Sequence, residues 1–475
     1  MHGKRDLLEV LADARIVGDL PPQVEAIVTD SRATKRGSLY VALRGARVDG
    51  HFFAQAAVEN GAIAIVTERE LAIAAPQVIV ADTRVAVSRL AAAFYGEPSH
   101  ALRIIGITGT NGKTTTTHFV RSIAEAAGEP CGIVGTLGAA FAGRAWPLDN
   151  TTPLALELHE LLAALRDAGA RTVAMEVSSH ALASGRVEDV RFAIAALTNI
   201  TRDHLDFHAT IERYAAAKRR LFELAPLAVL NLDDAWGARF AADFPQAIGY
   251  AIDAPAIVRA EGLRLRGDGS SFTVDGLEVR TALPGRFNVS NALAAFAIGR
   301  GLGYDDATIA RGIAATRAVP GRMERIGALG IDAIVDYAHT PDALENALRA
   351  ARETTRGRLI VVFGCGGDRD PGKRAEMGAI AAAVADRVIV TSDNPRSEDP
   401  LAIARMVAAG TSAEIELDRR QAIRLAIGAA AAGDVVLIAG KGHETYQIVG
   451  EQTLAFDDRD EVRAAFAQRA SAAAR

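Results

Sequence analysis

The sequence predicts an α/β protein built from three domains, and three observations favour this class. Short runs rich in valine and isoleucine alternate with alanine-rich helical stretches, which is the pattern of parallel sheets flanked by helices. The 475 residues exceed what one hydrophobic core supports, so about three domains are expected. The composition, 49% hydrophobic and 23% charged, is that of an ordinary globular protein.

The predicted strands are distributed along the whole chain. They lie at residues 62–66, 102–108, 172–177, 358–364, 387–393 and 434–440. Domain breaks are expected at Glu97-Pro98-Ser99 and at Pro320-Gly321, where proline interrupts the pattern. We therefore predict a small N-terminal α/β domain, a central parallel-sheet domain of the P-loop type and a C-terminal Rossmann-like α/β domain. Their predicted ranges are 1–98, 99–318 and 319–475.

Charge and composition exclude several classes of partner. A net charge of −5 argues against nucleic acid, whose phosphates attract strongly basic surfaces. Cys131 and Cys365 lie far apart in the sequence, as free thiols of a reducing compartment do. The N-terminus lacks the apolar core of a signal peptide, and no segment is long and apolar enough to span a membrane. We expect a cytoplasmic monomer without a membrane partner.

The stretch "GITGTNGKTTTTHF" at 106–119 has the features of a phosphate-binding loop. It departs from G-x-x-x-x-G-K-[ST], because Ile107 stands where the first glycine belongs. Its context is still strand, glycine turn and helix, so backbone N–H groups near Gly109 and Gly112 would form an anion nest at the helix N-terminus. Lys113 would reach the outer phosphates, and Thr114 or Thr115 would offer a hydroxyl to Mg²⁺. These features favour a nucleotide site over a plain glycine turn.

Two later segments place carboxylates and imidazoles directly after predicted strands. They are "AMEVSSHAL", with Glu176, Ser178, Ser179 and His180, and "LTNITRDHLDFH", with Asp203, His204, Asp206 and His208. The carboxyl ends of parallel strands are where ligands bind in open α/β sheets. Oxygen ligands with an occasional imidazole suit Mg²⁺, although each segment alone also fits a polar loop.

The segment "IERYAAAKRRLF" places a lysine on the apolar face of a predicted helix. Lys218 shares that face with Ile211, Tyr214, Leu221 and Phe222. Such a lysine usually extends its ammonium group to solvent. The alternative is chemical, because a desolvated lysine loses its proton more easily and the neutral amine can add carbon dioxide. The resulting carbamate is an anion that can bind a metal.

The shortened loop T-G-T-N-G-K-T-T resembles the ATP loop of the Mur ligase family, and the resemblance extends over nearly the whole chain. This family includes the enzymes that build the peptidoglycan stem peptide, and folylpolyglutamate synthase. "LPGRFNVSNALAAFAIG" at 283–299 is similar to its second nucleotide signature, while "VPGRME" and "VDYAHTPDAL", the latter with His339, are expected to close over ATP. The resemblance implies ATP contacts by Gly109, Thr110, Asn111, Gly112, Lys113, Thr114, Thr115, Asn291, Arg322 and Asp336.

The resemblance also implies the catalytic groups and the metal site. It assigns catalysis to Lys113, Glu176, His204 and Lys218, with Lys218 as N6-carboxylysine. It implies Mg²⁺ as a cofactor beside ATP. The implied metal ligands are Thr114, Thr115, Glu176, His204 and carbamylated Lys218.

The N-terminal "VTDSRATKRGSLYVALRGARVDGHFF" resembles the segment with which the later stem-peptide ligases hold the uridine end of a UDP-sugar. The resemblance therefore implies a UDP-binding N-terminal domain, which folylpolyglutamate synthase lacks. The matching positions are Thr29, Ser31, Ala46, Arg47 and Val48, with Arg47 standing where glutamine is commoner. The implied muramoyl-peptide contacts are Asn150, Thr151, Thr152, Ser178, Ser184 and Arg186.

Three loops of the predicted C-terminal domain follow strands: "CGGDRDPGKR", "SDNPRSEDP" and "AGKGHETYQ". A diamino diacid needs anions for its ammonium groups and a planar cation for its carboxylate, which arginine binds through paired N–H donors. By resemblance, "DNPR" is the signature of meso-diaminopimelate addition, although alone it also fits a polar turn. The implied contacts are Arg369, Asp393, Asn394, Pro395, Arg396, Gly440 and Glu444.

The resemblance implies an ATP-dependent amide ligase of peptidoglycan precursor synthesis, and thus of cell-wall growth and division. The expected reaction adds meso-diaminopimelate to UDP-N-acetylmuramoyl-L-alanyl-D-glutamate through an acyl phosphate. The nearer alternatives add L-lysine or D-alanyl-D-alanine, or act like folylpolyglutamate synthase. A nucleotide-binding regulatory protein with a decayed site is the alternative from another class.

Overall fold

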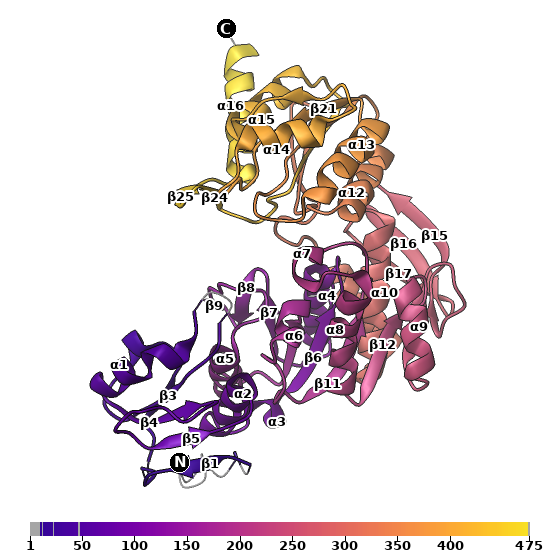
Figure 1. Cartoon of the computed structure of the whole chain (residues 1–475). Coiled ribbons are helices and arrows are strands. Elements are labelled where there is room, and N and C mark those ends of the chain that lie inside the picture. The colour runs from indigo at the N-terminus through magenta and orange to yellow at the C-terminus, as the bar shows by residue number, and fades with distance from the viewer. Residues whose placement is uncertain (1–9, 12, 22, 46–47, 474–475) are drawn as a thin grey trace. The chain divides into compact units, whose positions relative to one another are not determined.

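The computed structural model describes residues 10–11, 13–21, 23–45 and 48–473 (Figure 1). The chain forms two compact units. The first contains the described residues up to 106, together with 129–195 and 217–227. The second contains 107–128, 196–216 and the described residues from 228 onward. In the described part of the chain, no helix is both long and apolar enough to cross a membrane.

The first unit begins with a five-stranded sheet in the order β1-β5-β4-β3-β2. β2 to β5 pair in parallel, and β1 is antiparallel to β5. The strands are β1 (Arg15–Val17), β2 (Ala26–Val28), β3 (Ser38–Val41), β4 (Ala62–Thr67) and β5 (Gln77–Ile79). The helices are α1 (Ala54–Glu59), α2 (Thr83–Phe94) and α3 (Pro98–Ala101), with 3-10 turns at Ser31–Ala33 and Gly50–Phe53. Leu39, Val41, Ala64 and Val66 lie on one buried face of this sheet.

The rest of the first unit contains β7 paired in parallel with β10, and β8 and β9 added antiparallel. Its elements are β7 (Cys131–Gly135), β8 (Gly138–Phe141), β9 (Arg144–Trp146), α5 (Ala155–Asp167), β10 (Thr172–Glu176) and α6 (Ser179–Ala183). Four elements cross between the units along the chain: β6 (Arg103–Thr108), β11 (Phe192–Leu197), α8 (Ile211–Glu223) and β12 (Leu227–Asn231). The predicted strand at 172–177 is therefore confirmed.

The second unit opens with α4, which follows the glycine loop and packs against α10 and α11. β12, β13 and β14 pair in parallel, and β15 to β17 form an antiparallel sheet. The elements are α4 (Lys113–Ala126), α7 (Leu205–His208), β12 (Leu227–Asn231), α9 (Ala235–Asp243), β13 (Ile248–Ala251), β14 (Val258–Arg259), β15 (Glu261–Arg266), β16 (Gly269–Val274), β17 (Leu277–Thr281), α10 (Arg286–Gly301) and α11 (Asp306–Ala315).

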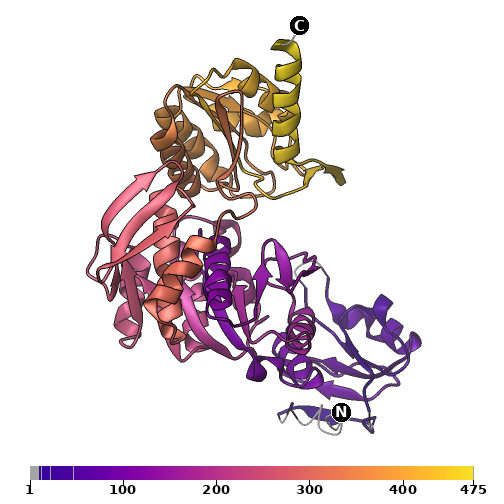
Figure 2. The same cartoon turned by 180° about the vertical axis from the view of Figure 1, so that it is seen from behind.

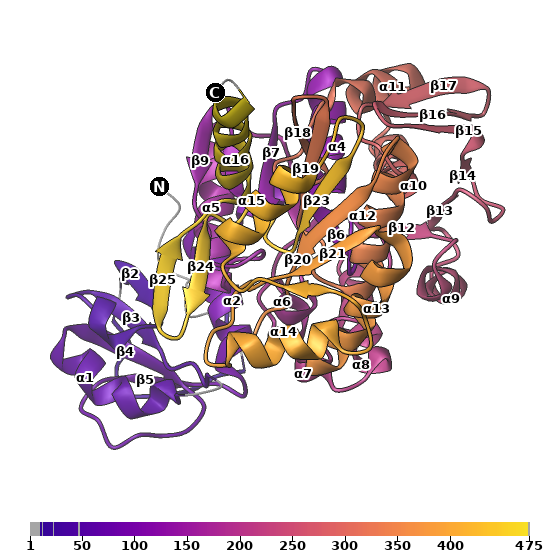
Figure 3. The ribbon, with the colours of Figure 1, turned by 90° about the horizontal axis from the view of Figure 1, so that it is seen from above.

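The C-terminal part holds a six-stranded sheet in the order β18-β19-β23-β20-β21-β22, most strands of which are labelled in Figure 3. Only the β18–β19 pair is antiparallel. The strands are β18 (Glu324–Ala328), β19 (Ile331–Asp336), β20 (Leu359–Phe363), β21 (Arg387–Val390), β22 (Glu414–Ile415) and β23 (Val435–Ala439), followed by the hairpin β24 (Tyr446–Val449) and β25 (Gln452–Ala455). The helices are α12 (Pro341–Thr354), α13 (Arg374–Val384), α14 (Pro400–Ala408), α15 (Arg419–Ala429) and α16 (Asp458–Ala473, yellow in Figure 2), with a 3-10 turn at Pro371–Lys373.

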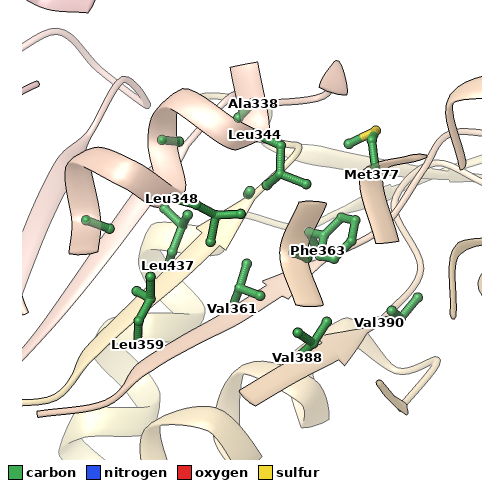
Figure 4. Close-up of a cluster of buried hydrophobic side chains, with 14 of the residues drawn as sticks. Ala338, Leu344, Leu348, Leu359, Val361, Phe363, Met377, Val388, Val390 and Leu437 are labelled. Atoms are coloured by element: carbon green, nitrogen blue, oxygen red, sulfur yellow. The ribbon is translucent and has the colours of Figure 1, made fainter. Parts of the chain in front are cut away.

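Alternating strand residues give this sheet two buried faces. Leu359, Val361 and Phe363 of β20 pack with α12 and α13 residues such as Leu344, Leu348 and Met377 (Figure 4). Ile360 and Val362 point the other way, into a cluster with α15 and α16. A parallel strand with helices on both sides reads as a continuous apolar run, which is why "RLIVVFG" was recognisable as a strand.

His159 in α5 is a buried polar group that the fold leaves unpartnered. Its side chain is 0% exposed, and neither ring nitrogen has a hydrogen-bond partner among the described residues. Burial lowers the pKa of His159 to about 4. Between pH 6.5 and 4, His159 is therefore protonated in the unfolded chain but stays neutral in the native protein. Because the unfolded state binds the additional proton, this residue makes the free energy of unfolding fall as the pH falls.

Replacing the His159 imidazole with an apolar group tests this contribution to the pH dependence of stability. We expect His159→Leu to make the melting temperature less sensitive to acid between pH 7.5 and 5, because about 2 kcal/mol of proton linkage over that range is removed. Differential scanning fluorimetry measures the effect. His100→Leu, at an exposed position of α3, is the control and should keep the wild-type pH dependence. An unchanged acid sensitivity in His159→Leu would contradict this account.

Candidate functional site

The glycine loop lies between β6 and α4 and is held by the segment that follows β11. The Thr198 N–H donates to Thr108 O at 3.0 Å, and the Thr110 N–H donates to Asn199 O at 2.8 Å. The Lys113 ammonium lies back over the loop, donating to Gly109 O at 2.8 Å and Thr110 O at 2.9 Å. The predicted order of strand, turn and helix is confirmed, with Lys113 as the first residue of the helix.

Two loop glycines are required by close packing. An ideal Cβ on Gly109 would lie 1.8 Å from Thr198 Oγ1, and one on Gly112 would lie 2.2 Å from Asn291 Oδ1. Both residues also have positive φ, which side-chain-bearing residues rarely adopt. Asn291 lies in α10, where its Nδ2 donates to Asn288 Oδ1 at 3.2 Å. The structure thus places the predicted Asn291 directly against the loop.

A cavity opens beside this loop within the second unit. Its apolar lining consists of Phe287, Ala343 and Ala347. The polar lining consists of Asn111, Gly112, Thr115, Asn199, Ser290, Asn291, Arg322, Asp336, Tyr337, Asp342 and Asn346, and Ala338 completes the wall. A concave lining that combines apolar side chains with polar groups is typical of a small-molecule site. We refer to it as the loop cavity.

Arg322 and Asp336, for which the sequence predicts contacts with ATP, both line the loop cavity. Arg322 Nη2 donates to Thr114 Oγ1 at 2.9 Å, and its guanidinium carbon lies 4.6 Å from the centre of the Tyr337 ring. Asp336 accepts from the N–H groups of Met323 at 2.8 Å and Ala338 at 2.9 Å. Burial raises the pKa of Asp336, although Arg322 and the two N–H donors oppose the shift. His339 lies close by, with its ring 4.6 Å from that of Tyr337.

Glu176 and the residues around it form a polar cluster inside the first unit. The Glu176 side chain is 1% exposed, and Thr136 donates to it from its N–H at 2.9 Å and its hydroxyl at 3.0 Å. Thr152 Oγ1 donates to Glu176 O at 3.0 Å, and Thr136 Oγ1 lies 3.1 Å from Thr151 Oγ1. Ser178 caps α6.

The predicted muramoyl-peptide residues gather at the same cluster. The Ser178 N–H donates to Thr152 Oγ1 at 3.0 Å. Arg186 donates to Thr152 O at 3.0 Å and to Ser184 Oγ at 3.2 Å, and burial lowers its pKa. Asn150 is half-buried in the segment leading to Thr151. The structure therefore brings together residues that lie up to 36 positions apart in the sequence.

Lys218 lies in α8, and His204 directly precedes α7. Lys218 is 2% exposed on the buried face of α8, which also carries Tyr214, Leu221 and Phe222. The solvent-exposed alternative for this lysine is therefore wrong, because its face packs inward. His204 precedes α7 with φ 52°, and its Nε2 lies 3.3 Å from Asp203 Oδ2. Although burial opposes ionisation, His204, His339 and Lys373 lower the pKa of Asp203.

The predicted uridine residues are only partly described. Ala46 and Arg47 lie outside the described residues. Ser31 is buried in its 3-10 turn and accepts from Asn60 Nδ2 at 2.9 Å through its carbonyl, while Thr29 is half-buried after β2. Val48 is 55% exposed.

The three C-terminal loops do converge at one edge of the six-stranded sheet. An ideal Cβ on Gly367 would lie 1.9 Å from Pro395 O, and one on Gly440 would lie 2.5 Å from Asp393 Oδ2. Arg396 Nη1 donates to Gly367 O at 2.8 Å, and Asn394 Nδ2 donates to Glu444 Oε2 at 2.9 Å. We call this group the edge cluster. It comprises the predicted residues Arg369, Asp393, Asn394, Pro395, Arg396, Gly440 and Glu444.

Two charged groups of the edge cluster remain open for a ligand. Asp393 is 8% exposed, and its Oδ2 has no hydrogen-bond partner among the described residues. A buried carboxylate oxygen without a donor is costly unless a ligand supplies one. Arg369 is exposed, and its Nη1 donates to Asp368 O at 3.0 Å. This arrangement suits a ligand that carries both ammonium and carboxylate groups.

The sequence did not single out several residues that line these sites. Asn199 pairs with Asn111 through two hydrogen bonds, of 3.0 and 3.2 Å. Asn111 Nδ2 also donates to Asp342 Oδ2 at 2.8 Å. Asn199 directly follows β11, a position that could have marked it. Asp342, in the first turn of α12, could be found only from the packing.

Within the part of the chain that the structure describes, no three histidine, cysteine, aspartate or glutamate side chains gather into a ready metal site. The predicted ligands combine one carboxylate, one imidazole, two hydroxyls and a lysine. Such a set would require the added carboxylate of a carbamate and oxygens from a bound phosphate.

Comparison with known proteins identifies the family to which this chain belongs. The Mur ligase family catalytic domain matches residues 23–95, the Mur ligase middle domain matches 107–299, and the Mur ligase glutamate ligase domain matches 321–442. The chain belongs to the Mur ligase family. The predicted three-domain α/β architecture is thereby confirmed.

Several similar proteins within this family share the name of one ligase. The UDP-N-acetylmuramoyl-L-alanyl-D-glutamate--2,6-diaminopimelate ligase of Geobacillus kaustophilus (strain HTA426) is 47% identical over 94% of this chain and 96% of the relative. Its namesake from Geobacter sulfurreducens (strain ATCC 51573 / DSM 12127 / PCA) is 43% identical over 97% and 98% of the two chains. A solved structure of a ligase with this name superposes with a TM-score of 0.70 and 35% identity over 98% of this chain and 99% of that one.

The contact between Gly112 and Asn291 yields a matched pair of variants. Gly112 and Gly128 flank the same helix with φ of 86° and 76°, but an added Cβ meets Asn291 only at Gly112 and open space at Gly128. We expect Gly112→Ala to lower kcat/KM by about 100-fold or more, since small displacements of positioning groups have that effect. Gly128→Ala should keep near-normal activity. Equal losses in a phosphate-release assay would show that backbone strain, not the clash, matters.

Proposed function

We propose that this chain joins meso-diaminopimelate to UDP-N-acetylmuramoyl-L-alanyl-D-glutamate at the expense of ATP, in the cytoplasmic synthesis of peptidoglycan precursors. The observation that carries this proposal is the edge cluster, in which a buried, unpartnered Asp393 oxygen lies among the predicted acceptor residues. Relatives with 43% and 47% identity over nearly the whole chain carry the name of this ligase. We further propose a monomer that needs neither nucleic acid nor membrane.

The loop cavity would bind ATP. Backbone N–H groups from Gly109 to Thr115 would surround the phosphates, and Lys113 would leave its carbonyl partners to reach the outer ones. Phe287, Ala343 and Ala347 provide an apolar surface for a base, with Asn291 beside it. Arg322 and Asp336 complete the pocket from the C-terminal part.

The environment of Glu176 fits a metal ligand. Its carboxylate is buried, and none of the described basic side chains pairs with it, although a buried charge needs an ion pair or a metal. Mg²⁺ would be held by Thr114, Thr115, Glu176, His204 and the carbamate of Lys218. When bound, this metal neutralises the charge that crowds the phosphates.

The chemistry follows from the weakness of a carboxylate as an electrophile. The D-glutamate carboxylate oxygen attacks the γ-phosphorus of ATP, which forms an acyl phosphate and releases ADP. The amine of meso-diaminopimelate then attacks the acyl carbon, and the tetrahedral intermediate expels phosphate while the nitrogen loses a proton. Lys113 and Arg322 would stabilise the transferring charge, and alignment of the substrates supplies most of the catalysis.

The acyl donor and acceptor would occupy the two polar clusters. The Glu176 cluster, with Thr151, Thr152, Ser178, Ser184 and Arg186, would hold the muramoyl dipeptide. The segment containing Thr29, Ser31 and Val48 would bind the uridine end. At the edge cluster, Arg369 and Arg396 would bind a carboxylate, and Asp393 and Glu444 would accept from an ammonium group.

The domain limits remain those predicted. We propose a UDP-sugar-binding domain over 1–98, an ATP-binding domain over 99–318 and an amino-acid-binding domain over 319–475. Support comes from the three family matches, each of which falls inside one of these ranges.

Phosphate release tests the proposed reaction. The purified protein is supplied with ATP, Mg²⁺ and the UDP-muramoyl dipeptide, and then with meso-diaminopimelate, L-lysine or D-alanyl-D-alanine in turn. We expect release only with meso-diaminopimelate, because only this acceptor offers an ammonium and a carboxylate at its distal end. Release with lysine would keep the ligase and overturn its specificity. No release with any acceptor would favour the regulatory alternative.

The carbamate on Lys218 has its own test. We expect Lys218→Ala to lower activity by about 100-fold and short carboxylic acids such as acetate to restore part of it, because they replace the missing metal-binding carboxylate. Arg219→Ala, next to it on the half-exposed side of α8, is the control and should stay active and indifferent to acetate. Near-normal activity of Lys218→Ala without added acid would exclude the carbamate.

A further inference from the structure

A buried lysine that the proposed reaction does not use contacts the edge cluster. Lys441 follows β23 directly after Gly440, and its side chain is 0% exposed. Its Nζ donates to Asn394 Oδ1 at 2.9 Å and to Glu444 Oε2 at 3.1 Å, and it lies 5.6 Å from the centre of the Tyr446 ring. Burying an ammonium group is costly, so a lysine at this position requires these partners.

These bonds fix how Asn394 is oriented. Oδ1 accepts from both Lys441 Nζ and the Ile448 N–H, each at 2.9 Å, while Nδ2 donates to Glu444 Oε2. An ammonium group has no acceptor, so the amide oxygen must face Lys441. Glu444 Oε2 in turn receives two donors, which hold that carboxylate at a single position.

The hairpin β24–β25 (Figure 1) also holds this segment. Gln447 Nε2 donates to Asp393 O at 2.8 Å, and the Arg396 N–H donates to Ile448 O at 3.2 Å. Arg396 has φ 51°, an unusual conformation for a residue with a side chain. The acceptor residues are thus held by the hairpin, through its backbone and the Gln447 side chain, and by the buried ammonium group of Lys441.

We propose that Lys441 is a positioning residue of the acceptor pocket. Its ammonium group orients Asn394 and Glu444 for the incoming diamino diacid without touching the reacting atoms. This inference rests on the proposed function. It predicts that loss of the ammonium group weakens acceptor binding selectively and that the effect passes through Glu444.

Lys441→Met removes the charge and the donors while keeping an unbranched side chain. We expect KM for meso-diaminopimelate to rise by about tenfold or more, as when partners of ligand-binding groups are lost, with KM for ATP and for the UDP-muramoyl dipeptide within about twofold. Lys441→Gln should show the same selective rise and replaces Lys441→Met if that variant does not fold. An unchanged KM for meso-diaminopimelate, or an equal rise for all three substrates, would overturn the proposal.

A double-mutant cycle separates positioning from general loss of structure. If Lys441 acts through Glu444, adding Lys441→Met to Glu444→Gln should raise KM for meso-diaminopimelate much less than it does in the wild type. Additive effects would overturn the proposal. Arg358→Met is the matched control, because it breaks the ion pair between Arg358 and Asp434. These two residues precede β20 and β23, at the end of the sheet that lies away from the edge cluster. Arg358→Met should lower the melting temperature without changing that KM.

The wild-type assay distinguishes the two levels of failure. If the wild type releases phosphate with meso-diaminopimelate and Lys441→Met has an unchanged KM for it, only the proposed role of Lys441 would be wrong. Absence of wild-type release with every acceptor would overturn the proposed function and this inference together.

Discussion

Parallel strands deliver every loop that follows them to the same edge of their sheet, and the candidate sites depend on this constraint. In the C-terminal part, β20, β21 and β23 pair in parallel through Val361 and Val362 and their neighbours. The loops after these strands must therefore meet, although up to about 75 residues separate them in the sequence. The helices on both faces bury the strands, so ligand-binding groups come from the loops at that edge.

Convergence on one edge creates crowding, and glycine relieves it. Gly440 lies against Asp393 Oδ2, and an ideal Cβ on Gly442 would lie 2.7 Å from Gly321 O. The glycine loop meets the same limit at Gly109 and Gly112, where neighbouring side chains occupy the space of a Cβ. Motifs rich in glycine therefore mark the places where backbones approach most closely, which are also the places where polar groups can surround a ligand.

Much of this architecture could be predicted from local patterns in the sequence. The strand before the glycine loop, the helix after it and the buried face of α8 with Lys218 follow from periodicity, because apolar spacing decides which face packs inward. The pairing of Asn111 with Asn199 and Asp342 does not follow, since 88 and 231 residues separate these partners. Lys441 was also missed, because a lysine after a strand normally faces solvent and only the assembled edge encloses it.

The central claim is that the edge cluster selects the acceptor. Its most direct test supplies ATP, the UDP-muramoyl dipeptide and equal concentrations of meso-diaminopimelate and L-lysine, and determines the masses of the UDP-linked products. The account predicts a product that contains diaminopimelate almost exclusively, because lysine lacks the distal carboxylate that Arg369 and Arg396 would bind. A product containing mainly lysine would contradict the account.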